Sequence, residues 1–271
     1  MPELPEVETT RRGIAEYVEG HRVDAMRVRQ RRFRVPVPDG LEQRIEGECF
    51  GTLQRRAKYL LLPIAGGHLL WHLGMSGSLR LTQADEPLRK HDHIDLDLSS
   101  GWQLRYHDPR RFGFVDFIEG NPLDDTRLAS LGPEPLSAAF TAELLAAKAK
   151  GKRVTIKSFI MDNAVVVGVG NIYANEALFM AGIDPRKPAG QVSEAALTLL
   201  VMAIKDVLTA AIAQGGTTLR DFVSGQNTPG YFAQQLRVYG RGGEPCIRCE
   251  CRLEQVVIGQ RATVFCPQCQ R

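Results

Sequence analysis

Four cysteines near the C-terminus constrain what this chain can fold into more than any other feature of its sequence. They form two C-x2-C pairs, Cys246 with Cys249 and Cys266 with Cys269, and sixteen residues separate the pairs. Two such knuckles can present four thiolates tetrahedrally to one zinc ion, and so small a terminal element could hardly fold without a metal. Because a four-thiolate site has no open position for water, the pattern predicts one structural zinc and not a catalytic one.

The other residues of this predicted finger indicate a small hairpin around the turn-like stretch VVIG. Arg261 lies near the tip of that hairpin, where it is either a specific contact to a polyanion or an ordinary solvated arginine. Cys251 is an extra thiol beside the first knuckle and could compete as a ligand. Cys49 is most simply a buried apolar residue.

The N-terminus, MPELPEVETT, places a proline directly after the initiator methionine. A small second residue permits removal of Met1. Pro2 would then carry a free secondary amine, which is a potential nucleophile.

The sequence carries no signal for export or for membrane insertion. Glu3, Glu6 and Glu8 occupy the place where a signal peptide needs basic and then apolar residues. The apolar stretch at 195–204 is about half as long as a membrane span. We therefore expect a cytoplasmic protein without a membrane partner, in which six cysteines indicate metal ligands or free thiols rather than disulfides.

The order of hydrophobic patterns along the 271 residues predicts an α+β multidomain fold. Residues 5–19 fit an amphipathic helix that begins with proline and acidic residues. Residues 22–118 alternate with a period of two between turn-like clusters, which predicts an antiparallel sandwich or barrel. Pro133 and Pro135 mark a hinge, and beyond them the period becomes helical up to the cysteine-rich end.

The formal net charge of +3 is too small to argue for nucleic acid by itself, so that case depends on where the charges lie. In RVRQRRFR at 27–34, alternate arginines of a strand could meet phosphates, or could protect a solvated edge strand. In HDPRRFGF, Arg110 could reach a base edge while Phe112 is driven between base pairs. The alternative for that stretch is a structural turn with Phe112 in the core.

Three further stretches offer weaker signals of the same kind. HLGMSG places Met75 between glycines at an apolar tip, although such a methionine usually belongs to the core. KHDH could suggest a metal, but with no third ligand nearby a phosphate contact for His91 is favoured. GVGNIYANE places Asn171 after two glycines at the start of a helix, a turn that suits a phosphate oxygen.

Taken together, these stretches resemble one protein family along essentially the whole chain. In order, they are PELPE, RRAKYLLL, HLGMSG, DPRRFG, MDN with GVGNIYANE, GGTTLRDF, PGYFAQQLRVYGR and the four-cysteine ribbon. This collinear set closely resembles the bacterial formamidopyrimidine-DNA glycosylases. The resemblance implies an N-terminal β-sandwich with an N-terminal helix (1–130), a helical helix-two-turn-helix domain (131–235) and a C-terminal zinc finger (236–271).

The resemblance also implies catalytic roles. Pro2 would attack C1′ of the damaged nucleotide, expel the base and become a Schiff base, and Glu3 would act as a general acid and base on the opening sugar. An α-amino group has an unperturbed pKa of about 8, so an appreciable fraction is unprotonated at neutral pH. Lys58 matches the lysine that assists β-elimination, and Arg261 matches the finger arginine assigned to δ-elimination. Glu6 and Glu8 are interpreted simply as acidic residues at the start of a helix.

The DNA contacts are implied in the same way. Met75, Arg110 and Phe112 match the residues that fill the gap left by a flipped-out nucleotide, with Arg110 facing the orphaned cytosine. The matched phosphate contacts are His91, Arg153, Lys157 and Asn171. GGTTLRDFVSGQNTPGYF resembles the mobile loop that closes over the flipped base, and none of its residues can be assigned to base recognition.

The sequence therefore predicts a bifunctional DNA glycosylase and AP lyase that excises 8-oxoguanine and formamidopyrimidines and nicks the strand by β,δ-elimination. We expect one structural zinc, no organic cofactor, a monomer, and duplex DNA with oxidised bases as the partner. One alternative is the sister endonuclease VIII type, which prefers oxidised pyrimidines. PELPE, with leucine where that sister family typically has glycine, favours purines together with the intact set of Met75, Arg110 and Phe112. The other alternative is a non-catalytic zinc-ribbon protein that only binds damaged DNA.

Overall fold

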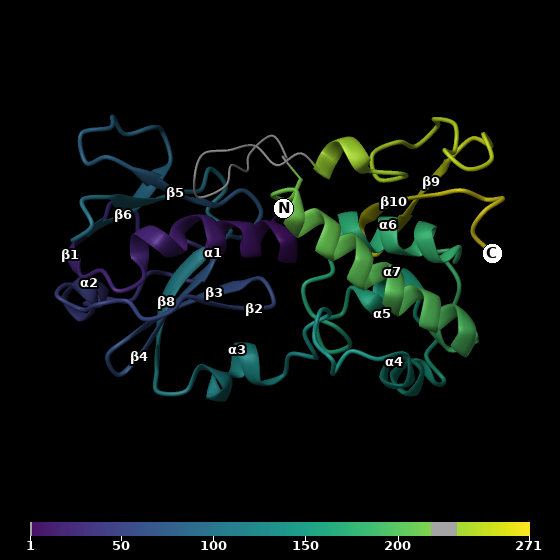
Figure 1. Cartoon of the computed structure of the whole chain (residues 1–271), viewed down its shortest axis with the longest axis horizontal. Helices are drawn as coiled ribbons and strands as arrows, with labels where there is room; N and C mark the ends of the chain where they lie inside the picture. The colour runs from purple at the N-terminus through teal and green to yellow at the C-terminus, as the bar shows by residue number, and fades with distance from the viewer. Residues whose placement is uncertain (1, 218–231) are drawn as a thin grey trace. The chain divides into compact units, whose positions relative to one another are not determined.

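The computed structural model in Figure 1 describes residues 2–217 and 232–271, and it divides into two compact units. The first unit consists of residues 1–129 and 214–233, and the second of residues 130–213 and 234–271. The chain therefore leaves the first unit, builds most of the second, returns, and ends in the second.

The first unit is built on two antiparallel four-stranded sheets. One sheet has the order β1-β6-β7-β5 and the other the order β2-β3-β4-β8. The strands are β1 (Val23–Val28), β2 (Gln54–Arg56), β3 (Tyr59–Ile64), β4 (Gly67–His72), β5 (Ser78–Thr82), β6 (Asp92–Leu98), β7 (Gln103–His107) and β8 (Phe114–Glu119). The short helices of this unit are α2 (Leu41–Ile45), η1 (Pro122–Asp124) and α3 (Thr126–Ala129). The predicted N-terminal β-sandwich is confirmed.

Helix α1 (Leu4–Val18) joins the two sheets, because it packs against β5 of one and against β2 and β3 of the other. Its apolar face is fully buried at Leu4, Val7, Ile14 and Val18, and each such side chain contributes about 2 kcal/mol of hydrophobic stabilisation. The predicted N-terminal helix therefore forms, and it closes one side of the sandwich.

Three of the five arginines of RVRQRRFR form ion pairs with acidic side chains of the protein itself. Arg27 pairs with Asp97 and Arg29 with Asp95, both across the β1–β6 pair, while Arg31 pairs with Glu42. Strand β1 lies at the edge of its sheet. Of the two sequence interpretations, the structure favours the charged edge strand over a row of phosphate contacts.

The second unit is mainly helical. Its helices are α4 (Ala142–Ala149), α5 (Ile156–Ile160), α6 (Asn171–Ala181), η2 (Ala189–Gln191) and α7 (Glu194–Ala213). Helix α6 begins after Gly170 and ends at Gly182, which adopts the left-handed conformation (φ 71°) that glycine allows at a helix C-terminus. The buried carboxylate of Glu176 in α6 accepts hydrogen bonds from the backbone N–H groups of 237–239, and so fixes the chain that leads into the finger.

Helix α7 is the one described helix that is long and apolar enough to cross a membrane by length and composition. In the structure it packs against α6 and α4, and its buried face includes Leu197, Leu200, Ile204 and Leu208. These contacts are those of a core helix of the second unit.

The last element is a hairpin of β9 (Glu254–Ile258) and β10 (Arg261–Phe265), preceded by η3 (Phe232–Gln235). Its two-residue loop, Gly259 and Gln260, has positive φ at both positions (55° and 60°). This backbone belongs to the hairpin turn whose twist matches that of the flanking strands. Arg261 is therefore the first residue of β10, directly after the turn.

Candidate functional site

The N-terminal segment of the first unit is buried and held by a carboxylate. Pro2 and Glu3 are both buried. The backbone N–H of Glu3 donates to Glu6 Oε2 at 2.9 Å, and Glu6 Oε1 accepts from both the N–H and the hydroxyl of Thr217, each at 2.9 Å. Glu6 is thus more than an acidic residue at a helix start, because it fixes the segment that carries Pro2.

The same carboxylate requires a glycine opposite. Gly216 has φ +77°, and a Cβ there would lie 3.0 Å from Glu6 Oε1. The glycines that the sequence offers just after α7 therefore let the backbone approach the N-terminal helix closely.

Glu8 also has a specific role that the sequence did not indicate. Its carboxylate accepts hydrogen bonds from Arg11, Arg12 and Arg55 at 2.8–3.2 Å. Burial alone would raise the pKa of Glu8, but the hydrogen bonds and charges of these arginines outweigh it and lower the pKa to about 2. Glu8 is therefore a fixed anion that ties α1 to β2.

Lys58 lies in a turn and not in a strand. Ala57 and Lys58 form the two-residue loop between β2 and β3, and Ala57 has a positive φ of 54°. The segments on both sides of Lys58 pair as strands, so this turn interrupts the alternation predicted across residues 22–118. A hairpin loop presents the lysine at the end of the sheet, on a rigid support.

Sequence reasoning missed His72, which lies beside Lys58. Burial, followed by the charges of Lys58 and Arg34, lowers the pKa of His72 to about 4. Its Nδ1 accepts a hydrogen bond from the Gly74 N–H at 3.0 Å, so that nitrogen carries no proton. The imidazole is neutral at neutral pH and adds no positive charge beside Lys58. The histidine that opens HLGMSG was the available signal.

The structure brings together Met75, Arg110 and Phe112, which come from two different loops. Met75 and Phe112 are 37% and 43% exposed, which excludes the core alternative for both. The Arg110 guanidinium lies 4.7 Å from the centre of the Phe112 ring. Three long side chains thus project from neighbouring loops at one place, as a wedge that fills a gap in a base stack must do.

The two loops touch through glycines. Gly74 has φ +67°, and a Cβ there would lie 2.3 Å from the backbone nitrogen of Gly113. A Cβ on Gly113 would lie 1.9 Å from the hydroxyl of Tyr106. Only glycine permits this approach.

Asp108 is the polar centre of the same arrangement, and it is fully buried. Its carboxylate accepts hydrogen bonds from the hydroxyl of Ser76 (2.7 Å), the hydroxyl of Tyr106 (3.1 Å) and the N–H of Gly113 (2.9 Å). Ser76 follows Met75, so one carboxylate fixes both loops. The sequence contained Asp108 within DPRRFG but gave it no role.

His91 is half-buried, with a positive φ of 78°, and its carbonyl accepts from the Asp108 N–H at 3.1 Å. The ring centres of His93 and His107 lie 6.0 and 6.1 Å away. Among the described residues, only the four finger cysteines are close enough together to hold a metal ion. His91 therefore lies beside the loop of Asp108, and this position is compatible with the phosphate contact expected of it.

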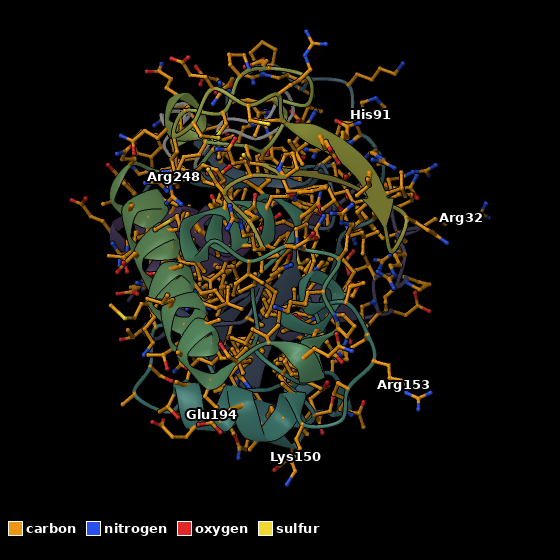
Figure 2. The ribbon with its side chains drawn as sticks, turned by 90° about the vertical axis from the view of Figure 1, so that its right-hand side faces the viewer. Arg32, His91, Lys150, Arg153, Glu194 and Arg248 are labelled. Atoms are coloured by element: carbon orange, nitrogen blue, oxygen red, sulfur yellow. The ribbon has the colours of Figure 1, made fainter. Side chains whose placement is uncertain are left out.

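In the second unit, Arg153 is exposed and projects away from the ribbon in Figure 2. Asn171 is half-buried at the first position of α6, and its amide donates to the carbonyl of Ala262 at 3.1 Å. The stretch GGTTLRDFVSGQNTPGYF lies outside the described residues except at its ends.

Lys157 departs from the expected environment of a phosphate contact. It is 1% exposed, and its ammonium donates to the carbonyl of Ala262 (3.1 Å) and to the hydroxyl of Thr263 (2.6 Å). The ammonium therefore bonds to β10 in this structure. The sequence could not show this, because the partner lies about a hundred residues further along the chain.

The four predicted cysteine ligands converge. Their sulfur atoms all lie within 4.8 Å of one another, with 4.0 Å between Cys246 and Cys269 and 3.5 Å between Cys249 and Cys266. Tetrahedral zinc–thiolate bonds of about 2.3 Å require sulfur atoms about 3.8 Å apart, so the set fits one zinc ion. Around the site, Phe179, Val238, Leu253 and Val264 form the small hydrophobic core of the finger.

The other two cysteines are not part of the four-thiol cluster, although Cys251 packs against the finger core. Cys251 is not one of the four clustered thiols, and its sulfur lies 3.8 Å from the carbonyl of Arg252. Cys49 is exposed, so the interpretation of Cys49 as a buried residue is wrong. Its neighbour Phe50 takes the buried position, and the alternation of the chain turns Cys49 outward.

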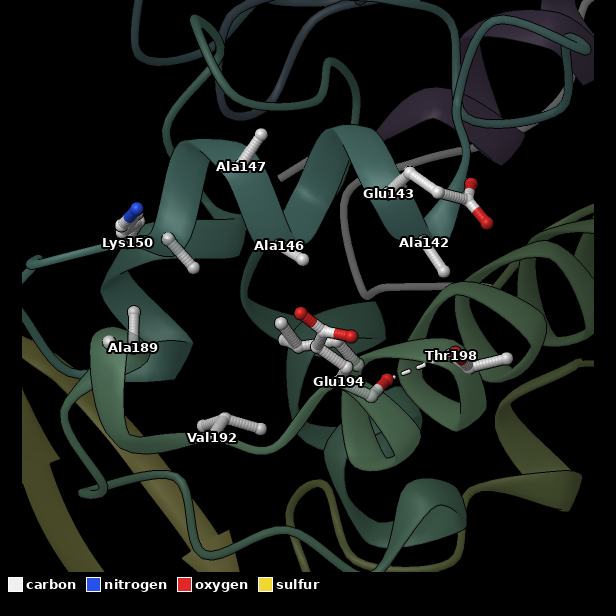
Figure 3. A pocket seen from close by; sticks show the side chains of 12 residues that line it. Ala142, Glu143, Ala146, Ala147, Lys150, Ala189, Val192, Glu194 and Thr198 are labelled. Carbon is white, nitrogen blue, oxygen red and sulfur yellow. Dashed lines mark hydrogen bonds between the residues drawn. The ribbon is translucent and has the colours of Figure 1, made fainter.

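A hollow of about 620 Å³ lies between α4, η2 and α7. Figure 3 shows its lining, which is mostly short side chains such as Ala142, Ala146 and Ala189, together with the charged side chains of Glu143, Lys150 and Glu194. No predicted site residue lines it, and we assign it no function.

Comparison with known proteins decides the family. Models of the formamidopyrimidine-DNA glycosylase N-terminal domain and H2TH domain match residues 1–115 and 131–223, and the zinc finger found in FPG and IleRS matches residues 243–271. The chain belongs to the formamidopyrimidine-DNA glycosylase family. It is 57% identical over 271 residues, the whole of both chains, to the formamidopyrimidine-DNA glycosylases of Pseudomonas paraeruginosa and of a Pseudomonas aeruginosa strain.

Solved structures of the family agree with this assignment. Fpg of Lactococcus lactis in complex with DNA that contains an abasic site is 33% identical, with a TM-score of 0.93 and full coverage of both chains. MutM (Fpg) of Thermus thermophilus is 36% identical, with a TM-score of 0.89 and coverage of 99% and 98%. The predicted fold class, with its sandwich, helix-two-turn-helix domain and zinc finger, is therefore confirmed.

Proposed function

We propose that this protein is a DNA glycosylase and AP lyase that removes oxidised purines from duplex DNA through the amine of Pro2. The observation that carries the proposal is the full-length match to a family of such enzymes in a chain that places proline directly after Met1. Relatives in complex with Fapy-dG and 8-oxo-G DNA support purines over the pyrimidines of the endonuclease VIII type.

The reaction begins at the N-terminus. Removal of Met1 frees the Pro2 amine, whose lone pair attacks C1′ while the bond from C1′ to the base breaks and the base leaves. The attached nitrogen then loses its proton, and its lone pair forms the C=N bond of the Schiff base while the bond from C1′ to O4′ breaks. Glu3 gives a proton to O4′ as the sugar ring opens. The bonds of Glu6 to the Glu3 N–H and to Thr217 fix the direction of approach of this segment.

The strand is cut in the following steps. Loss of the C2′ proton expels the 3′ phosphate, and Lys58 assists this β-elimination from its hairpin loop. Loss of the C4′ proton then expels the 5′ phosphate. The Arg261 guanidinium offers several N–H donors and no acceptor, so its part in this δ-elimination is to stabilise the departing phosphate.

The DNA is held by residues of both units. Met75, Arg110 and Phe112 fill the gap left by the flipped nucleotide, and the Arg110 fork faces the base opposite. His91, Arg153, Lys157 and Asn171 are all proposed as phosphate contacts in the DNA-bound state, and the Lys157 ammonium bonds to β10 in this structure. The zinc closes the finger but supplies no chemistry, since its ligands are four thiolates.

We further propose that the divisions 1–130, 131–235 and 236–271 mark functional domains, and that the protein acts as a monomer in the cytoplasm, associated with the nucleoid through DNA.

Borohydride trapping tests the proposal. Zinc-loaded protein without Met1 is mixed with duplexes that carry 8-oxoguanine opposite cytosine, thymine glycol, or no lesion, and the crosslink is mapped by mass spectrometry. We expect trapping at Pro2, preferentially on the 8-oxoguanine strand, and its loss in Pro2→Gly with affinity for damaged DNA largely retained. Better trapping on thymine glycol would instead support the endonuclease VIII type. Tight binding without trapping would support the non-catalytic alternative.

A further inference from the structure

The finger arginine, Arg261, lies in a hairpin that needs contacts from outside to be stable. Arg261 is exposed and follows directly after the two-residue turn of the β9–β10 hairpin. A hairpin of two five-residue strands is marginally stable by itself. The direction in which Arg261 points therefore depends on what holds the first residues of β10 from outside the hairpin.

A buried lysine of α5 provides this support. Lys157 is 1% exposed, and its ammonium reaches Ala262 and Thr263, the two residues that follow Arg261. Helix α5 is itself fixed by its N-cap, Thr155, whose hydroxyl accepts from the Ser158 N–H. A buried ammonium bonded to one short stretch of strand must hold that stretch strongly, since leaving it unbonded would be costly.

Thr263 extends the connection to Arg261 itself. Its hydroxyl accepts from the Lys157 ammonium at 2.6 Å and donates to the carbonyl of Arg261 at 3.2 Å. A hydroxyl has one donor and can accept at the same time, so both bonds can exist together. An unbroken chain of hydrogen bonds thus runs from the ammonium of α5 to the backbone of the finger arginine.

Helix α6 holds the same strand beside this chain. The Asn171 amide donates to the Ala262 carbonyl that Lys157 also contacts, and Asn175 Oδ1 accepts from the Val264 N–H at 2.8 Å. Two residues matched by sequence to phosphate contacts, Lys157 and Asn171, therefore share one backbone oxygen next to Arg261.

We propose that Lys157, acting through Thr263, is a positioning residue that fixes Arg261 for the δ-elimination step. This inference rests on the proposed function of Arg261. It predicts that breaking the chain at Thr263 changes the outcome of strand cleavage even though neither residue needs to touch the reacting atoms.

The experiment uses full-length, zinc-loaded protein and a duplex with a preformed abasic site, so that base release does not enter the measurement. The quantity measured is the ratio of the β,δ-product, which ends in a 3′ phosphate, to the β-product, which ends in an unsaturated aldehyde. In Thr263→Val and Lys157→Met we expect this ratio to fall by roughly tenfold to a hundredfold, as displacements of about 1 Å do to positioned groups.

Matched variants separate positioning from folding. Thr263→Ser keeps the hydroxyl and should give the wild-type ratio. Lys205→Met removes an ammonium that donates to the carbonyl of Ser137, away from the hairpin, and should leave the ratio unchanged. Zinc content and thermal unfolding are measured for every variant. If Thr263→Val loses zinc, the double variant Lys157→Met with Thr263→Val removes both partners, so that no buried ammonium is left without its hydroxyl acceptor.

The outcomes distinguish this inference from the proposed function. Wild-type ratios in zinc-loaded Thr263→Val and Lys157→Met, or in the double variant, would overturn the positioning role. The positioning role is supported if Arg261→Gln, Thr263→Val and Lys157→Met each lose the β,δ-product. A wild-type ratio in Arg261→Gln would refute the role of Arg261, and a wild-type protein that does not cut abasic DNA would refute the proposed lyase.

Discussion

At the scale of single residues, buried charges decide how this protein responds to pH. Glu8, with its pKa lowered to about 2 by Arg11, Arg12 and Arg55, stabilises the fold above its ordinary pKa of 4.5. That contribution, of the order of 2 kcal/mol, is lost as the pH falls from about 4.5 towards 2. In urea unfolding, Glu8→Gln should be less stable than wild type at pH 6, and the difference should shrink at low pH. Glu16→Gln, an exposed change on the same helix, should have the stability of wild type at both pH values.

Single residues are also where the sequence was least informative about partners. It indicated which residues matter but not what they touch, because a bond such as that between Lys157 and Thr263 joins positions 106 apart in the chain. For the same reason Asp108 and His72 received no role, although both organise side chains that were predicted. Burial of a polar group becomes visible only once the elements around it are placed.

At the scale of elements, the contact between the loops of Met75 and Phe112 carries a sharp prediction. Gly74→Ala should separate the loops, since a Cβ would lie 2.3 Å from a backbone nitrogen. Preference for 8-oxoguanine opposite cytosine over adenine should then fall by about tenfold, the value of one good base contact. Gly101→Ala is the matched control, because Gly101 also has positive φ (+83°) but nothing within 4 Å. Equal preference in the two variants would contradict the role of this contact.

The finger is the second element with a testable dependence. Its core is small, and without a metal nothing links its two pairs of cysteines, so metal removal should unfold it. In a chelator titration in which zinc release is measured, DNA cleavage should be lost as zinc leaves. The far-ultraviolet circular dichroism of the sandwich should persist. Cys249→Ser should lose zinc and Cys251→Ser should keep it. Zinc loss in Cys251→Ser would mean that Cys251 is a ligand.

Element types and their order were largely predictable from sequence. The period of two, the long apolar helix and the spacing of the cysteines are local patterns, and each formed the expected structure. Lys58 shows the limit, because a two-residue loop is too short to stand out between two strand patterns. The return of Gly216 and Thr217 to the first unit was equally hidden, since it depends on the distant carboxylate of Glu6.

At the scale of the whole molecule, the net charge of +3 is too small to attract DNA by itself, so binding must depend on individual basic side chains. Many basic side chains are used internally, as with Arg27, Arg29 and Arg31, and these cannot release counterions from DNA. Affinity should still fall steeply with salt, with a slope of about −0.9 in log K against log salt for each phosphate neutralised. Exposed Arg153 is expected to be one such contact, so Arg153→Gln should make the slope shallower by about 0.9. Arg22→Gln is the control, because that guanidinium already pairs with Asp24 at 2.9 Å. An unchanged slope in Arg153→Gln would remove Arg153 from the DNA interface, whereas a change in both variants would indicate general electrostatic attraction rather than a defined phosphate contact.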